Sequence, residues 1–398
     1  MTFRNIFKHH PIEHRYNISD SIALVNADDW NVLVQDENIY LSHAYLRSLE
    51  NSVEGLEYRY ALIYNQELKP VMAAYFQVVD VDNLDEYYKK FLLQYANESV
   101  LDKILPSVGL QLIICGNLFI CGENGYSFDE SIDLEKANDL LAKAFDRVSK
   151  AITSKGKTSL MLIKELYPEN DPSMNAFSED KFHPFHIDCN MVLNLQEDWN
   201  SMEDYYGSMT SKFRTKANKI MRSSADLRIR EFNASDIRAH AAIVDQLHQN
   251  VVDKADFSLG ELNSLSFAAL KENLLDAFSF MAYFYKDELI GFSVGLIGKG
   301  VLDAAHVGIN YEFNTTKSLY QRMLHDFVRL AIERNITQVR FGRTAEQLKS
   351  TLGAIPVNMR LYIKHRNHMV NHLLGGLIEG IKPSRFELRK PFKEFQAN

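Results

Sequence analysis

The sequence predicts an α/β protein made of two units of like design. The chain has 398 residues, which is too long for one ordinary hydrophobic core and favours two domains. One order of elements, namely hairpin, strand, helix and strand, recurs in the two halves, as expected of an internal duplication. A hydrophobic content of 46% and a charged content of 24% are those of a soluble globular protein.

The first half contains β-rich and amphipathic segments in that order. Two runs with a polar turn between them predict an antiparallel hairpin, at Tyr58–Tyr64 and Val71–Val79. A further strand is expected at Leu110–Cys115, extended by Leu118–Cys121. Apolar residues at three- and four-residue spacing then predict a helix at Leu134–Lys150, followed by a strand at Ser159–Ile163.

The second half repeats this order. We expect a hairpin, a strand, a helix and a last strand at Ser279–Tyr285 with Leu289–Ile297, Val301–Gly308, Ser318–Arg334 and Thr337–Phe341. The polar segment Asn170–Lys181 is typical of a linker. The sequence therefore predicts a first unit over residues 1–170 and a second over residues 182–398.

Charge and cysteine content narrow the class of protein. A net charge of -8 gives no overall attraction to nucleic acid or to an anionic membrane. Cys115, Cys121 and Cys189 form no C-x-x-C pair, which favours a reducing cytoplasm and argues against a zinc site. No metal is expected, and His183 and His186 are assigned to packing. The absence of an apolar run of about 18 residues predicts no transmembrane helix.

A polar loop follows the last strand of the second half. Open α/β sheets bind ligands at the carboxyl ends of their strands, and Gly342–Gly353 begins at such an end. Arginine suits bidentate recognition of carboxylate or phosphate, and lysine supplies a compact charge. We therefore expect Arg343, Thr344 and Lys349 to contact substrate or cofactor; the alternative is an ordinary surface loop.

A basic segment precedes the second hairpin. Lys212, Arg214 and Lys216, followed by two more cations, lie in a stretch with no acid between Asp204 and Asp226. Such a run is either a solvated helix face or a contact for an anion. The anion would be a phosphate-bearing cofactor or an RNA backbone.

Three further residues are candidates for proton transfer. His306 lies late in a predicted strand, and an imidazole titrates near neutral pH and can accept a proton from an attacking amine. Asp303 precedes it on the same strand, and Tyr320 lies on the following helix. The alternative is that all three are packing residues. Sequence motifs for nucleophilic hydrolases, P-loops, zinc proteases and dinucleotide binding are absent.

Several segments of the second half together resemble one family. Asp204–Arg222, Asp287–Phe292, Tyr320–Ala331 and Phe341–Val357 are similar to the GNAT-superfamily acyltransferases of the Fem-like branch, the bacterial peptidoglycan-biosynthesis-like proteins. The similarity is good over Asp188–His365 and vague over the first half. The resemblance implies two tandem GNAT-like units, each a mixed, mostly antiparallel sheet flanked by helices.

One stretch departs from the family pattern. GNAT enzymes hold the pyrophosphate of coenzyme A with a glycine-containing loop, whereas the corresponding Asn310–Tyr320 has no glycine. Thr316, Lys317 and Ser318 can still offer hydroxyls, a charge and a helix N-terminus to phosphate. A longer acyl-CoA, an acyl carrier protein or an aminoacyl-tRNA therefore stays open as the donor.

The resemblance implies a cytoplasmic N-acyltransferase. It would move an acyl group from an acyl-CoA or acyl carrier protein thioester to the amine of an amino acid, amino sugar or aminolipid. Backbone N–H groups near Val307–Ile309 would stabilise the oxyanion. The first alternative is a Fem-type aminoacyltransferase that uses aminoacyl-tRNA on a cell-wall precursor, although no long heptad run for a coiled-coil arm is present. The second is a non-catalytic GNAT-like binding module.

Overall fold

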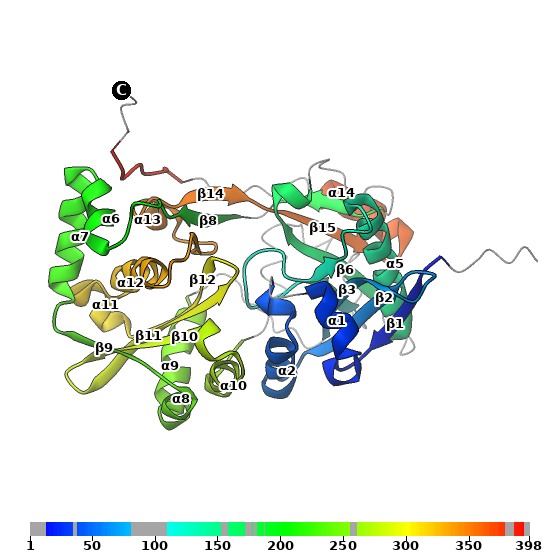
Figure 1. The fold of residues 1–398 in the computed structure, drawn as a ribbon, viewed down its shortest axis with the longest axis horizontal. Coiled ribbons are helices and arrows are strands. Elements are labelled where there is room, and N and C mark those ends of the chain that lie inside the picture. Colours follow the sequence, from blue (N-terminus) through cyan, green and yellow to red (C-terminus); the bar gives the residue numbers. More distant parts are fainter. Residues whose placement is uncertain are drawn as a thin grey trace, which may run out of the picture.

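The computed structural model describes residues 13–34, 38–80, 110–152, 158–171, 177, 181–186, 188–254, 261–378 and 386–393. Two mixed sheets lie side by side, each flanked by helices (Figure 1). The predicted α/β fold with two like units is therefore confirmed. None of the described helices is long and apolar enough to cross a membrane.

The first part of the chain forms most of the first sheet and its helices. Its elements are β1 (Arg15–Ser19), α1 (Ala27–Val34), α2 (His43–Ser52), β2 (Glu57–Tyr64), β3 (Pro70–Asp80), β4 (Leu110–Cys115), β5 (Tyr126–Phe128), α5 (Leu134–Ile152), β6 (Thr158–Leu166) and β7 (His183–Phe185).

The second part forms the second sheet and returns to the first. Its elements are β8 (Cys189–Asn194), α6 (Met202–Ser208), α7 (Ser211–Ser223), β9 (Leu227–Glu231), α8 (Ala234–Ala239), α9 (Ala241–Val252), α10 (Ser264–Leu274), β10 (Phe278–Tyr285), β11 (Glu288–Gly298), β12 (Val301–Ile309), α11 (Tyr311–Lys317), α12 (Leu319–Glu333), β13 (Gln338–Arg340), α13 (Glu346–Ser350), β14 (Ile355–Asn358), β15 (Arg360–His365) and α14 (His368–Ile378).

The two sheets follow one plan. The first has the strand order β1-β2-β3-β4-β6-β15-β7, and the second, read from its other edge, has β9-β10-β11-β12-β13-β8-β14. In each sheet the fourth and fifth strands are parallel and joined by a helix, α5 or α12. The predicted duplication is thus present in the topology.

One strand crosses from the second part of the chain into the first sheet. β15 comes from the C-terminal part of the chain and lies between β6 and β7 of the first sheet. β8 follows β7 in the chain and lies between β13 and β14 of the second sheet. The bounds 1–170 and 182–398 stay a prediction, to which the strand pairing adds that β15 belongs to the first sheet. Most of the expected linker lies outside the described residues.

One expected strand is absent. Both hairpins form as expected, but the extension Leu118–Cys121 is a loop rather than a strand. Gly116 has φ 137°, and the chain turns there. Side-chain oxygens bind the backbone N–H groups that a strand would pair with its neighbour. Gln77 Oε1 accepts from the Leu118 N–H at 2.8 Å, and Asn117 Oδ1 accepts from the Phe119 N–H at 2.9 Å.

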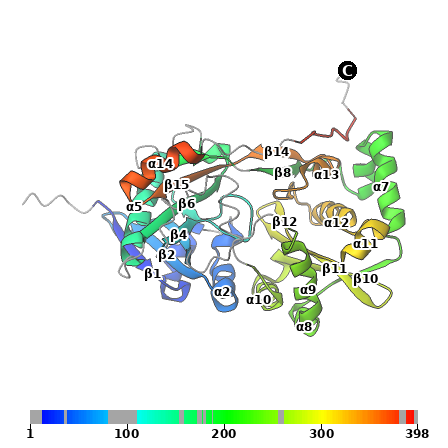
Figure 2. The same cartoon turned by 180° about the vertical axis from the view of Figure 1, so that it is seen from behind.

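The hydrophobic core runs across both units. One cluster joins α2 and sheet residues of the first unit to α9, α10 and the face of the second sheet that α9 and α10 cover. Asn273 of α10 donates to Ser48 Oγ of α2 at 3.0 Å, and Figure 2 shows these two helices side by side. On the other face of the second sheet, α12 buries residues at three- and four-residue spacing. The units therefore meet along a packed interface.

Candidate active site

The parallel strands β12 and β13 pair over a short distance only. Their register joins Val301 to Gln338, Leu302 to Val339 and Asp303 to Arg340, where the pairing of described residues ends. β12 continues to Ile309 along β11. An opening therefore forms between the carboxyl ends of two neighbouring strands, where open α/β sheets place their ligands.

A bulge shapes β12 beside this opening. Gly295 pairs with Ala304 and Val294 pairs with His306, so Ala305 has no opposite residue. An extra residue shifts the alternation of side chains between the two faces. As a result Asp303, Ala305 and His306 all face the core cluster that the two units share.

A cavity of about 230 Å³ lies at the opening and between the two units. The first unit contributes the loop of residues 118–121, and the second contributes residues 303–305 of β12. The remaining wall is the end of β13 and the loop after it, residues 340–344. The cavity brings together the predicted site residues Asp303, Arg343 and Thr344.

Asp303 is a buried carboxyl with one hydroxyl partner. Its side chain is 9% exposed, and Tyr40 of the first unit donates its O–H to Oδ2 at 2.6 Å. Burial raises the pKa of Asp303 from 3.8 to about 6, against the lowering effect of the Arg340 charge and of the Tyr40 hydrogen bond. A carboxyl with such a pKa exchanges a proton near neutral pH.

Arg343 is held by a charge cluster of the first unit. Its Nη1 lies 2.7 Å from Glu165 Oε1, and its side chain keeps 32% exposure. Glu165 also accepts from the Gly122 N–H at 2.6 Å and pairs with Lys164 Nζ at 2.5 Å. The Glu165 carboxylate raises the pKa of Arg343. The guanidinium is thus fixed at the cavity wall.

Lys349 lies behind the loop. It is 2% exposed, and Nζ donates to the carbonyl oxygens of Gly342 at 3.2 Å and Arg343 at 2.5 Å. Burial lowers its pKa to about 8. Thr344 beside it has φ 63°, an uncommon conformation for a side-chain-bearing residue that marks functional sites. These contacts hold the loop in shape, and ligand contact by Lys349 stays a prediction.

His306 lies outside the cavity wall. Its ring packs 5.7 Å from His248 and 5.6 Å from Phe267, measured between ring centroids. Burial lowers the pKa of His306 to about 3, with a smaller effect from His248. The imidazole is therefore neutral at pH 7 and a weak base.

The residues expected to hold phosphate lie at the N-terminus of α12. Lys317 Nζ lies 2.5 Å from Asp226 Oδ2, and Ser318 Oγ accepts from Ser223 Oγ at 3.0 Å. Thr316 lies in the same short helix, α11. The segment expected as a loop is therefore helical, and two of its polar groups have protein partners.

Tyr320 is a half-buried residue of the first turn of α12. Burial raises its pKa to about 12. Its backbone N–H donates to Asn314 Oδ1 at 3.0 Å, so this N-terminus already has a side-chain acceptor. A catalytic role for Tyr320 stays a prediction.

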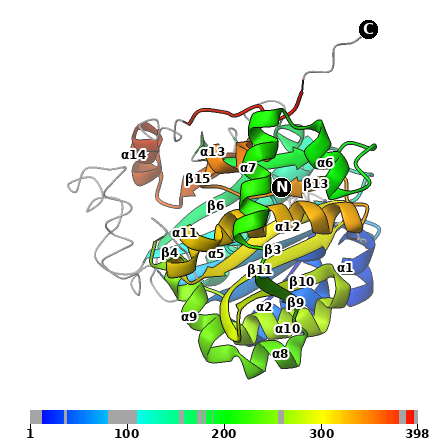
Figure 3. The same cartoon turned by 90° about the vertical axis from the view of Figure 1, so that its left-hand side faces the viewer.

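The basic segment forms α7 at the end of the molecule far from the first unit (Figure 1), the end that faces the viewer in Figure 3. Lys212 and Lys216 are exposed and Arg214 is half-buried. None of these three forms an ion pair with a described residue. They are not brought to the cavity.

Several residues in the cavity wall, or bonded to it, were not singled out by the sequence patterns. Tyr40, Glu165 and Lys164 come from the first unit, whose similarity to any family was vague. Arg340 could be expected, because it ends the strand that precedes the loop. Burial raises the pKa of Cys121 in the wall to about 12, so its thiol is unreactive at neutral pH. Among the described residues no cluster of three or more His, Cys, Asp or Glu could hold a metal.

Comparison with known proteins identifies the fold. No protein-family model and no curated protein sequence matches the chain. The solved structure of FemX is similar at a TM-score of 0.58 and 8% identity, covering 90% of this chain and all of FemX. A tandem GNAT protein from the clavulanic acid biosynthesis pathway is similar at a TM-score of 0.51 and 9% identity, covering 89% and 99%.

These likenesses define a class of protein at the level of fold. The chain has a tandem GNAT fold, the fold of GCN5-related N-acetyltransferases used twice. Its fold is similar to that of FemX, in agreement with the resemblance to the Fem-like branch in the sequence. Identities of 8% and 9% fix neither a donor nor an acceptor.

Proposed function

We propose that the protein is an N-acyltransferase that moves an acyl group from a thioester to an amine at the cavity between its units. The observation that carries this proposal is the opening between β12 and β13 next to a buried carboxyl whose pKa lies near neutrality. The donor is an acyl-CoA or an acyl carrier protein, and the acceptor is a small amine. The three cysteines are free, which suits a protein of the reducing cytoplasm.

The donor carbonyl would lie against β12 beyond Asp303. Backbone N–H groups on that side of the strand are free of a ladder partner among the described residues, and the stretch Val307–Ile309 is the expected oxyanion site. Preorganised donors of this kind stabilise a developing negative charge more than water does. Holding both reactants together supplies a further large part of the rate.

Asp303 would act as the general base. It accepts the proton of the acceptor ammonium, and the free amine attacks the thioester carbonyl to form a C–N bond. The tetrahedral intermediate then collapses and the C–S bond breaks. The departing thiolate takes up the second proton that the nitrogen loses, and the proton on Asp303 passes to solvent. This assignment replaces His306, because the imidazole lies outside the cavity wall and is too weakly basic.

The loop after β13 would bind the acceptor. Arg343 presents a fixed guanidinium, which suits a carboxylate or phosphate of the acceptor, and Thr344 adds a hydroxyl. Thr316, Lys317 and Ser318 would lie near the donor phosphates at the start of α12. Lys349 would act through the loop that it holds.

A Fem-type aminoacyltransferase is the second candidate. It is favoured by the unpaired cations of α7, since a row of such charges fits the phosphate backbone of a tRNA. It predicts that activity depends on charged tRNA and is lost on treatment with ribonuclease. The non-catalytic binding module predicts no turnover of any donor.

A thermal-shift panel separates these candidates. The ligands are coenzyme A, acetyl-CoA, palmitoyl-CoA and a UDP-linked cell-wall precursor, each with the purified protein. A ligand at about 100 times its Kd stabilises by about 2.7 kcal/mol. Stabilisation by coenzyme A compounds supports the thioester mechanism, whereas stabilisation by the cell-wall precursor alone favours the aminoacyltransferase.

A further inference from the structure

A second concave site lies on α12, on the face of the second sheet opposite to α9. It is a groove of about 360 Å³ between one flank of the helix and two strands, the edge strand β9 and its neighbour β10. Its apolar floor is formed by Leu227, Ile229 and Met281, which are half-buried and continue the core. Its other wall is polar, with Arg322, Asp326, Arg329 and Glu333, beside Leu330.

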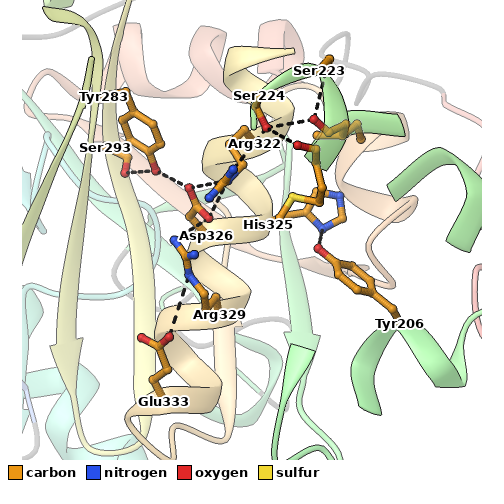
Figure 4. A network of polar contacts seen from close by, with 12 residues as sticks. Tyr206, Ser223, Ser224, Tyr283, Ser293, Arg322, His325, Asp326, Arg329 and Glu333 are labelled. Carbon is orange, nitrogen blue, oxygen red and sulfur yellow. Dashed lines mark hydrogen bonds and ion pairs between the residues drawn. The ribbon is translucent and has the colours of Figure 1, made fainter. Parts of the chain in front are cut away.

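The polar wall is preorganised by one buried carboxylate. Asp326 accepts from Arg322 Nε at 2.9 Å and from the Tyr283 hydroxyl at 3.0 Å, and Arg329 Nη2 lies 2.7 Å from its Oδ1. Figure 4 shows these groups along one flank of α12, while His325 and Tyr206 occupy the opposite flank. Asp326 is only 4% exposed, so the network is rigid.

Arg329 retains binding capacity in this network. Its side chain is 33% exposed, and one of its nitrogens contacts Asp326. Its Nε lies 3.9 Å from Glu333 Oε1, too far for a hydrogen bond, and Glu333 is 63% exposed. Arg322, by contrast, is committed to Asp326 and to Ser224 Oγ. One edge of the Arg329 guanidinium is therefore open to a ligand.

In the first unit, the position that corresponds to this groove is filled by an aromatic side chain. There β1 is the edge strand that pairs with β2, as β9 pairs with β10. The guanidinium of Arg147 on α5 lies 4.2 Å from the ring centroid of Tyr16. An aromatic side chain thus covers the sheet and stacks on the arginine in that unit. In the second unit the β9 residues at the groove, Leu227 and Ile229, are smaller. The groove therefore stays open there, and Arg329 stays partly exposed.

We propose that this groove binds a small carboxylate with an apolar chain. The apolar part would cover Leu227, Ile229 and Met281, and the carboxylate would pair with the open edge of Arg329. A planar guanidinium edge matches a carboxylate in shape and charge. A doubly charged phosphate is disfavoured, because Asp326 and Glu333 flank the arginine and repel it more strongly.

Decanoate is the probe, and isothermal titration calorimetry on the full-length protein is the measurement. We expect decanoate to bind and decanol, of equal chain length but without charge, to bind at least about tenfold more weakly. Arg329→Gln removes the open donor and should weaken decanoate at least about tenfold. Glu333→Gln removes a competing exposed acid and should tighten it roughly two- to fivefold.

Lys212→Gln on α7 is the matched control, because it removes one exposed positive charge away from the groove. It should leave decanoate affinity unchanged within twofold, about the error of such a titration. Equal binding of decanoate and decanol, absence of decanoate binding, or equal loss in Lys212→Gln and Arg329→Gln would each overturn the proposal. Glu333→Gln is a surface change, and a gain in affinity does not arise from misfolding. An unchanged or weakened affinity in that variant also contradicts the proposal.

Discussion

At the scale of single residues, Asp303 combines a functional position with an energetic cost. Its carboxyl is buried at the cavity and has the Tyr40 hydroxyl as a neutral partner. Burial disfavours the charged form, which is why its pKa rises to about 6. A strained or costly group of this kind is retained at functional sites.

Replacement of Asp303 by asparagine separates this cost from the function. Asparagine keeps an oxygen acceptor for Tyr40 but carries no charge, so we expect Asp303→Asn to stabilise the fold at pH 7.5. A shift of about two pKa units corresponds to about 3 kcal/mol, an upper bound for the gain. Urea unfolding of both proteins checks this. A loss of stability at pH 7.5 would show that the carboxylate is favourably paired instead.

The pH dependence of stability follows from the same residue. The folded pKa is raised, so the contribution of Asp303 to stability is fully present below about pH 3.8 and is lost as the pH rises through about 6. The difference in unfolding free energy between wild type and Asp303→Asn should therefore develop between these values. Urea unfolding at pH 4, 5, 6 and 7 measures it, and a pH-independent difference contradicts the shift.

At the scale of elements, the loop after β13 depends on Lys349. The ammonium of this residue donates to two carbonyl oxygens of the loop, at Gly342 and Arg343. Lys349 is therefore a positioning residue for Arg343 at the cavity wall. Gly342 has φ 72°, a conformation that glycine adopts without strain.

Lys349→Met tests this role. Methionine keeps the volume but removes the donor, so the Arg343 carbonyl loses its Lys349 partner and the Gly342 carbonyl keeps only the Met191 N–H. Stability should therefore fall by about 1–3 kcal/mol. Thermal unfolding measures the loss. Lys219→Met, at an exposed lysine of α7, is the matched control and should change stability by no more than about 0.5 kcal/mol. Equal effects of the two substitutions would contradict the role.

Local elements were predictable from the sequence, and long-range pairing was not. The two hairpins and α12 follow from patterns within about 20 residues. The sequence of β15 is that of an ordinary strand, but its partner β6 lies about 200 residues earlier. No local sequence pattern predicts that pairing. Likewise Asp303 and Arg343 are marked by sequence patterns in their own half. Tyr40 and Glu165 contact these two residues only through the packing of the two units.

At the scale of the whole molecule, the position of β15 inside the first sheet and the shared core make the two units depend on each other. β15 lies inside the first sheet and β8 inside the second, and the two units share a core. Removing the second unit would take β15 out of the first sheet, and removing either unit would uncover an apolar face of the other. The cavity likewise needs walls from both units.

We therefore expect the two units to unfold together. Differential scanning calorimetry of the intact chain should give one transition with equal calorimetric and van't Hoff enthalpies. Addition of a ligand that occupies the cavity should shift that single transition as a whole. Two separate transitions, of which a cavity ligand moves only one, would contradict the interdependence.

The most direct test of the proposed function is the release of free thiol from an acyl thioester in the presence of amines. Wild type should release thiol from at least one acyl-CoA or acyl carrier protein only when an amine acceptor is present, with a rate that rises with pH through about 6. Asp303→Asn should lower kcat by about 10²–10⁴-fold. Wild-type turnover in Asp303→Asn, or release that depends on charged tRNA alone, would contradict the proposed mechanism.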